Sequence, residues 1–349
     1  MLYGGPSGAV YGVLIVFVLF GCMLLHELAH GVVAHKLGLA VSRITFLPIG
    51  ILLEVPPGSP SQEIAIALVG PLANLGLGLA MGLFIPSMAL DLIALRRLLE
   101  ALLTPGLTGI LVYLVIVNVF LGIFNLLPAF PMDGGRILRA GLAHTIDYVL
   151  ATRIAAWIGR GLAIVMGLVG FIVFPMAGLP PEPALVVVAG VVFLGARHEE
   201  LYVRQQRALV QLEVKDIYQH SSETTAPWDV VTKALVVRLF KQDEVLPVVI
   251  EDRVVGLLTY QETRKSLGQD KSVTIAHVMR TDFPVLQLQD TLWVALRIMN
   301  ASQLARLPVV HEGVFQGTLG LDDIDRAWRL HPLRRKDNNR PVMSEDISQ

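Results

Sequence analysis

Long apolar runs separated by short polar breaks fill the first half of the chain, whereas residues 197–349 have the composition of an ordinary soluble domain. A run of about 20 apolar residues is long enough to cross a bilayer as a helix. Such runs, the last of them short, cover residues 9–33, 64–86, 107–127, 154–174 and 184–196. The pattern therefore predicts a polytopic α-helical membrane domain over residues 1–196, with five spans.

The segment from Ser42 to Glu54, between the first two runs, departs from this pattern. It is rich in β-branched residues and is interrupted or followed by prolines and glycine, which is typical of short strands and turns. We expect a short re-entrant β-hairpin at the membrane face.

A second break follows the third run. Residues 125–136 contain two prolines and two glycines, which end a helix. Asp133 therefore lies on irregular backbone, which at membrane depth must be buried in protein or line a wet cavity. The second run opens with Gly70-Pro71 and continues with spaced glycines, which predicts close helix packing.

The soluble half contains an internal repeat at a constant offset of 61 residues, as Val214 and Ile275 illustrate. At this offset Leu246-Pro247-Val248-Val249 aligns with Leu307-Pro308-Val309-Val310. Each copy is predicted to form a strand, a helix, a strand, a tight turn, a strand and a helix. We therefore assign residues 213–332 to a tandem α+β pair, residues 197–212 to a helical connector, and residues 333–349 to a disordered tail.

Composition supports a membrane protein, with 54% hydrophobic and 16% charged residues and a mean hydropathy of +0.61. The net charge of −1 leads us to expect no nucleic-acid partner. The single cysteine, Cys22, excludes an intrachain disulfide and is interpreted as a small buried residue. No cleavable signal peptide is expected, because the first residues lack a basic region.

Lysine and arginine residues near the span ends are distributed unevenly. One set of alternate loops contains only Arg96 and Arg97. The other set contains Lys36, Arg43, Arg136, Arg139, Arg153, Arg197, Arg204 and Arg207. The positive-inside rule therefore places the soluble C-terminal half in the cytoplasm and the N-terminus outside.

The first apolar run contains the motif His26-Glu27-Leu28-Ala29-His30. Residues four apart lie on one face of a helix, so the two imidazoles can bind one zinc ion. Glu27 beside them can act as general base on the attacking water. Ionisable residues at membrane depth are costly and mark functional sites, which favours a zinc site over two structural histidines.

A hydrolytic zinc site needs a third protein ligand and an open position. Asp133 is the favoured candidate, because it is an acidic residue in a broken segment at membrane depth. His35 and His144 are the alternatives. His35 would face away from His30 on the helix, and His144 lies in a segment typical of a surface loop.

Three motifs, in this order, resemble the site-2 protease family of intramembrane zinc metalloproteases. They are the His26–His30 motif, Gly70-Pro71 with Asn74, and N-x-x-P-x-x-P-x-D-G-G from Asn125 to Gly135. The tandem repeat resembles a pair of cystathionine-β-synthase (CBS) domains, and site-2 proteases with this C-terminal pair form a bacterial and archaeal branch. Together the resemblances cover about residues 10–330.

The resemblance implies one zinc ion bound by His26, His30 and Asp133. It also implies that Glu27 is the general base and that Asn125 is a polar contributor near the reacting carbonyl. The chain would then be a zinc endopeptidase, integral to a prokaryotic plasma membrane. It would cleave a transmembrane or membrane-associated protein substrate, in regulated intramembrane proteolysis.

The resemblance also implies roles for the other elements. The hairpin would offer an edge on which an unwound substrate pairs its backbone. The cytoplasmic CBS pair would regulate the protease, with an adenine nucleotide as its candidate ligand. Beyond the lipid bilayer and the substrate, a second copy of the chain is a candidate partner.

Two features depart from the family pattern. The branch usually has one more transmembrane helix before the motif helix, whereas here the first apolar run contains the motif. We therefore expect either an N-terminally truncated sequence or an enzyme that works with five spans. The T/S-x-x-D motif that contacts ribose in CBS domains appears as Thr259-x-x-Glu262 in the first copy and as Gly320-x-x-Asp323 in the second. Each copy keeps one half of the motif, so no nucleotide-binding residue is assigned.

Two alternatives remain at this stage. A CBS-regulated membrane transporter or channel would use Asn74, Asn125 and Asp133 as a polar pathway. It has no use for a glutamate beside two histidines one turn apart, and the spans show no inverted repeat. A non-catalytic metal-binding membrane scaffold would differ from the protease by activity alone.

Overall fold

The computed structural model describes residues 6–39, 43–47, 50–54, 58–85, 100, 106–176, 180, 182–220, 223–232, 235–236, 239, 245–264 and 273–337. The chain divides into two compact units, Met1–Val203 and Arg204–Gln349.

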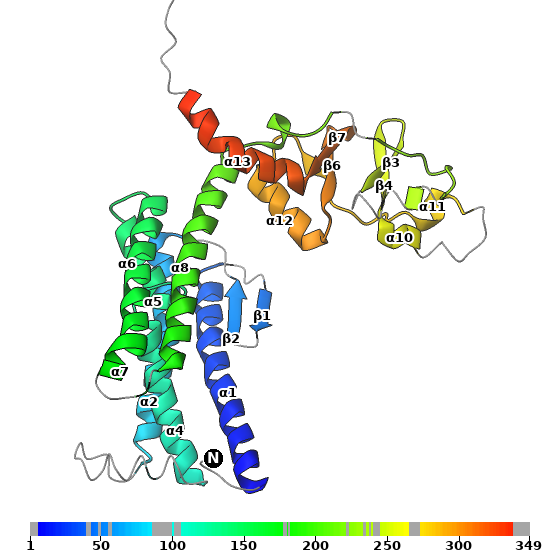
Figure 1. The fold of residues 1–349 in the computed structure, drawn as a ribbon. Coiled ribbons are helices and arrows are strands. Elements are labelled where there is room, and N and C mark those ends of the chain that lie inside the picture. Colours follow the sequence, from blue (N-terminus) through cyan, green and yellow to red (C-terminus); the bar gives the residue numbers. More distant parts are fainter. Residues whose placement is uncertain are drawn as a thin grey trace, which may run out of the picture. The chain divides into compact units, whose positions relative to one another are not determined.

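The elements that begin in the first unit are α1 (Pro6–Lys36), β1 (Arg43–Leu47), β2 (Gly50–Glu54), α2 (Pro60–Gly82), α4 (Leu107–Asn125), α5 (Asp133–Ala143), α6 (Tyr148–Leu168), η1 (Val169–Val173), α7 (Phe174–Met176) and α8 (Pro183–Val210) (Figure 1). Those of the second unit are η2 (Val214–Asp216), β3 (Leu246–Ile250), β4 (Arg253–Leu258), α10 (Tyr260–Arg264), α11 (Ile275–Val278), β5 (Leu286–Gln287), α12 (Leu292–Ser302), β6 (Arg306–His311), β7 (Val314–Gly320) and α13 (Leu321–Asp337).

Four helical segments of the described chain are long and apolar enough to cross a membrane: Gly8–Lys36, Pro60–Gly82, Leu107–Asn125 and Tyr148–Met176. They coincide with the first four predicted spans. The predicted fifth, 184–196, is not among them. Its apolar residues form only the first part of α8, and charged residues from Arg197 onward follow in the same helix.

Helix α2 begins at a capping box. The N–H of Gln62 donates to Oγ of Ser59 at 3.3 Å, and the N–H of Ser59 donates to Oε1 of Gln62 at 2.8 Å. Pro60 occupies the first turn, where a missing N–H costs little. From this start α2 packs against α1, α4 and α5, so it is the central helix of the unit.

Glycines allow α2 and α4 to approach closely. A Cβ on Gly122 would lie 2.6 Å from Cγ of Leu75, and one on Gly78 would lie 3.1 Å from Cγ2 of Val119. Contacts this short exclude a larger residue at position 122 without rearrangement. Close packing of the glycine-spaced run is thus confirmed at Gly78.

Strands β1 and β2 form an antiparallel pair in which Arg43 is opposite Glu54 and Leu47 is opposite Gly50. β2 lies along α1 (Figure 1). The two predicted strands are therefore present as an antiparallel pair, and their re-entrant placement at the membrane face stays a prediction.

The sequence repeat reappears in the backbone of the second unit. β3 and β4 form an antiparallel pair, as do β6 and β7, and β5 adds to β6 in parallel. Both hairpins have a register shift at the equivalent place, between Val248 and Val249 and between Val309 and Val310. Both turn through two residues with positive φ: Glu251, Asp252, Glu312 and Gly313. The predicted order of elements is confirmed for the second copy, whereas part of the first lies outside the described residues.

The first segment of each copy pairs with the other copy. Gln219 of the first copy bridges to Thr318 of the second, and at the equivalent positions Arg280 bridges back to Leu257. This reciprocal exchange explains why the two copies fold as one unit.

The predicted connector, 197–212, is the second part of α8 together with the turn that follows it, and the division between the units falls within it. α13 continues to Asp337, beyond the predicted start of the tail at residue 333. The remainder of that tail lies outside the described residues.

Candidate metal centre

His26 and His30 lie one turn apart on α1, and their Nε2 atoms are 3.1 Å apart. Both side chains are buried. The neighbouring Cys22 is also buried, and its Sγ accepts a hydrogen bond from Nδ2 of Asn118 on α4 at 3.2 Å. The thiol therefore belongs to the α1–α4 contact, in agreement with its interpretation as a small buried residue.

Asp133, the first residue of α5, completes the cluster. Its Oδ2 lies 3.1 Å from Nε2 of His26 and 3.2 Å from Nε2 of His30. In the described part of the chain, these three side chains are the one group of histidine, cysteine and acidic residues close enough to hold a metal ion. The two alternative ligands lie elsewhere: His35 is exposed, and Nδ1 of His144 is 2.8 Å from the carbonyl of Ala140.

The two glycines after Asp133 set its position. A Cβ on Gly134 would lie 2.2 Å from the carbonyl oxygen of Leu127, and one on Gly135 would lie 2.7 Å from the carbonyl carbon of Ala129. Only glycine lets α5 start against the chain that leaves α4. The D-G-G sequence therefore brings the carboxylate back to α1.

Contacts from α2 orient the imidazoles. Nδ1–H of His30 donates to the carbonyl of Ile66 at 2.7 Å, which leaves Nε2 with its lone pair facing the cluster. A Cβ on Gly70 would lie 2.3 Å from Nε2 of His30 and 2.8 Å from Cε1 of His26. Because Gly70 has no side chain, the two imidazole rings can occupy the space beside it.

This donor set fits zinc. Two imidazole nitrogens and one carboxylate oxygen are typical ligands of a hydrolytic zinc site. Tetrahedral zinc with ligands at about 2.0–2.1 Å requires donor atoms roughly 3.3 Å apart. The three observed separations, 3.1, 3.1 and 3.2 Å, match that requirement.

A cavity of about 100 Å³ adjoins the cluster and is lined by Met23, His26, Glu27, Leu121 and Asn125. A cavity needs only ~10–15 Å³ of such space to hold one water. Nδ2 of Asn125 donates to the carbonyl of Leu121 at 2.9 Å, so one of its two N–H bonds remains for another acceptor. The structure thus brings both predicted catalytic residues to one cavity that is large enough for water and that His26 also lines.

A charged network near this site was not predicted from the sequence. Arg139 on α5 is 5% exposed and pairs with Glu63 of α2 and Glu199 of α8. Burial by itself lowers the pKa of Arg139, but the two carboxylates raise it. The pKa of Arg139 therefore lies above its ordinary value. From the sequence, the only role assigned to Arg139 was that of one of the positively charged residues that indicate the cytoplasmic side.

Comparison with known proteins agrees with this geometry. Residues 14–168 match Peptidase family M50, and residues 275–329 match the CBS domain. Zinc metalloprotease MJ0392 of Methanocaldococcus jannaschii is 29% identical over 332 residues, which are 95% of this chain and 89% of that protein. The solved site-2 protease from the same organism is 31% identical, with 56% of this chain and 88% of that chain covered and a TM-score of 0.40.

The sequence matches, together with the cluster of His26, His30 and Asp133, favour a zinc hydrolase over a transporter or a channel. Residues 14–168 are therefore a peptidase family M50 (site-2 protease) domain, and the chain is a zinc metalloprotease with a CBS domain at its C-terminus.

Proposed function

We propose that His26, His30 and Asp133 hold the zinc ion and that the chain hydrolyses peptide bonds of a transmembrane or membrane-associated protein. The observation that carries this proposal is the set of three buried donors at 3.1–3.2 Å beside the cavity that Glu27 lines. When bound, zinc supplies Lewis acidity, which polarises a carbonyl and makes water more acidic.

Glu27 is the general base in this proposal. It neighbours His26 on α1 and lines the same cavity. Its carboxylate takes the proton of the attacking water and later delivers it to the leaving amine. Asn125, with one N–H available, donates to the oxygen of the reacting carbonyl, where negative charge develops.

The substrate has to be unwound before it can be cut. An extended segment in or near lipid must pair its backbone N–H and C=O groups with another structure. We propose that the β1–β2 hairpin is a re-entrant element that supplies this edge by strand addition. Its position along α1, the helix that carries Glu27, supports this role.

We further propose that the C-terminal unit lies in the cytoplasm of a prokaryotic cell and regulates the protease through residues 197–212. The support is the continuity of α8, which includes Glu199 and also Leu209, a residue of the hydrophobic core of the second unit. A ligand shifts activity only by its different affinity for the active and inactive states.

An adenine nucleotide is the ligand to test first, because the CBS resemblance suggests it. The carboxylate of Asp323 is already engaged: Oδ1 accepts from Gln219 at 2.9 Å, and Oδ2 accepts from the N–H of Gly320 at 2.9 Å. Thr259 likewise donates to Glu262. Binding would have to displace these contacts, so we expect weak affinity. Calorimetry and cleavage by the full chain with and without nucleotide test both steps.

The decisive experiment on the reaction is Glu27→Gln in the full chain, reconstituted in lipid vesicles with a single-span reporter protein. The amide keeps the size of the side chain but cannot take up the proton. We expect zinc content to stay at the wild-type level and the cleavage rate to fall about 10²–10⁴-fold. Cleavage at the wild-type rate would refute the role of Glu27.

A further inference from the structure

We propose that Arg139 is a positioning residue of the metal centre: it locks α5, which begins with Asp133, against α2 and α8. The proposal rests on the ligand roles proposed above for His26, His30 and Asp133. Within the described residues, Arg139 forms no hydrogen bond or ion pair with the three ligands and does not line the cavity, so its effect passes through the helix that it holds.

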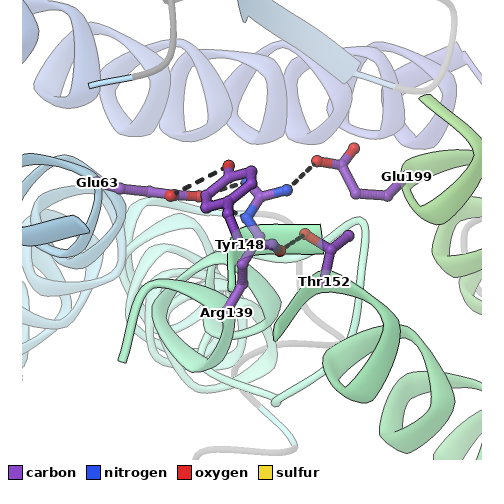
Figure 2. A network of polar contacts seen from close by, with 5 residues as sticks. All are labelled: Glu63, Arg139, Tyr148, Thr152 and Glu199. Carbon is purple, nitrogen blue, oxygen red and sulfur yellow. Dashed lines mark hydrogen bonds and ion pairs between the residues drawn. The ribbon is translucent and has the colours of Figure 1, made fainter. Parts of the chain in front are cut away.

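The guanidinium of Arg139 is held along its edges by two carboxylates (Figure 2). Nε donates to Oε1 of Glu63 at 2.8 Å, and Nη2 pairs with the same oxygen. Nη1 pairs with Oε1 of Glu199. One buried cation therefore joins α5 to α2 on one side and to α8 on the other.

Aromatic rings hold the guanidinium as well. Its central carbon lies 5.0 Å from the ring centroid of Phe130 and 5.0 Å from that of Tyr148. The hydroxyl of Tyr148 donates to Oε2 of Glu63 at 3.3 Å, as Figure 2 shows. A planar, forked cation satisfies this arrangement, whereas the compact ammonium of lysine cannot. The surrounding groups therefore fix the position of the Arg139 guanidinium as well as neutralising its charge.

Both helices joined by the Arg139–Glu63 pair reach the metal ligands. α5 is an 11-residue helix whose first residue is Asp133, so Arg139 lies about 9 Å further along its axis. Glu63 is in the first turn of α2, one turn before Ile66, whose carbonyl accepts from His30. The pair therefore fixes the helix of one ligand relative to the helix that orients another.

Helix α5 packs along α2 and α6, and two of its contacts bear on the direction of Asp133. At its start, Gly134 lies against the carbonyl of Leu127, where a Cβ would be 2.2 Å from the oxygen. Arg139 makes the second contact, further along the helix. With the second contact released, α5 pivots about the first, and the carboxylate of Asp133 changes direction relative to His26 and His30.

A purely structural role is the competing explanation, and the chain contains a control for it. Arg160 on α6 pairs with Glu200 of α8 at 2.9 Å and lies over the ring of Trp157 at 5.0 Å. Like Arg139, Arg160 joins its own helix to α8 through a glutamate and lies against an aromatic ring. Within the described residues, Arg160 forms no ion pair or hydrogen bond with α5 or α2, so its loss should weaken α8 packing without moving a ligand.

The test compares Arg139→Met and Arg160→Met in the full chain in lipid vesicles. Zinc retention against a chelator and the visible spectrum of the cobalt(II)-substituted protein report the ligand geometry, and thermal unfolding reports the fold. We expect Arg139→Met to weaken zinc binding about tenfold, the lower end for residues that orient ligands, and to shift the cobalt spectrum. Arg160→Met should change neither.

Two milder variants keep the test decisive if Arg139→Met does not fold. Arg139→Lys keeps the positive charge but loses the forked N–H donors of the guanidinium. Glu63→Gln keeps a hydrogen-bond acceptor but loses the negative charge. Each should shift the cobalt spectrum in the same direction as Arg139→Met.

Wild-type zinc affinity and an unchanged spectrum in a folded Arg139 variant would overturn the proposal, as would equal shifts in Arg160→Met. Failure of the wild-type chain to retain zinc would instead refute the ligand set.

Discussion

Gly70 and His30 face each other so closely that a Cβ at position 70 would lie 2.3 Å from Nε2 of the imidazole. The same short helix segment supplies the carbonyl of Ile66, which accepts from Nδ1 of His30 at 2.7 Å. α2 therefore holds the ring from both sides. One contact fixes the tautomer, and the other leaves room for the ring.

Gly70→Ala should displace the imidazoles while leaving α2 helical. The new methyl group would clash with His30 and, at 2.8 Å, with Cε1 of His26. We expect zinc affinity to fall about 10–100-fold, as measured by competition with a chelator. Gly76→Ala on the same helix is the control, because a Cβ there meets nothing within 4 Å. Equal zinc affinity in the two variants would contradict this account.

Asp133→Asn should remove the third ligand with almost no change in size. A neutral amide is a poor zinc ligand compared with a carboxylate, so we expect stoichiometric zinc in the wild type and substoichiometric zinc in the variant. His144→Asn should keep full zinc content, because that imidazole lies at the end of α5, against the carbonyl of Ala140. Metal analysis of the purified chains decides the matter, and loss of zinc from His144→Asn would reopen the choice of ligand.

The three side chains of the cluster could be singled out from the sequence because each stands in a local pattern. Two histidines four residues apart must share a helix face, and Asp133 follows prolines in a segment that cannot continue as helix. The hairpin could be predicted for the same reason, since turn residues are a local property of the sequence. The repeat could be predicted because comparing the sequence with itself reveals a constant offset.

The supporting contacts could not be predicted because they join distant segments. Nothing near Arg139 in the sequence indicates that Glu63 and Glu199 meet it, and the pairing follows only from the packing of α2, α5 and α8. The choice of Ile66 as hydrogen-bond acceptor for His30 depends on helix register in the same way.

Gly317→Ala should destabilise the second unit more than the equivalent Gly256→Ala. Gly317 has φ +154°, and a Cβ there would lie 1.9 Å from the carbonyl oxygen of Gln219, which belongs to the segment exchanged between the copies. At Gly256 the nearest atom is Sδ of Met279 at 2.6 Å, the end of a flexible side chain that can move.

We expect the free energy of unfolding of the second unit to fall by about 1–3 kcal/mol or more in Gly317→Ala and by less in Gly256→Ala. Thermal unfolding and limited proteolysis of the C-terminal unit within the full chain measure both. Equal stability of the two variants would show that the exchanged segment adapts to the methyl group.

The membrane topology depends on α8, which composition alone does not classify as a span. Gly170, beyond the end of α6, packs against Leu185, where a Cβ would lie 3.1 Å from Cβ of Leu185. Ala163 clusters with Val192, and Ala155 and Ala156 cluster with Ala196. α8 therefore runs antiparallel along the length of α6. Its charged residues Glu199 and Glu200 are paired with arginines, which reduces the cost of placing them near the membrane.

We accordingly expect α8 to be a fifth crossing, with the N-terminus outside and the C-terminus in the cytoplasm. Single cysteines are introduced at Ser7 and Ser344 in a Cys22→Ala background, and intact cells are treated with an impermeant maleimide. The maleimide should label the cysteine at position 7 in intact cells and the cysteine at position 344 only after permeabilisation. Cys22→Ala is a mild change, because Nδ2 of Asn118 keeps its bond to the carbonyl of Leu114 at 2.8 Å. Labelling of both positions in intact cells would mean that α8 does not cross. The CBS unit would then lie outside, and no cytoplasmic ligand could regulate the protease through it.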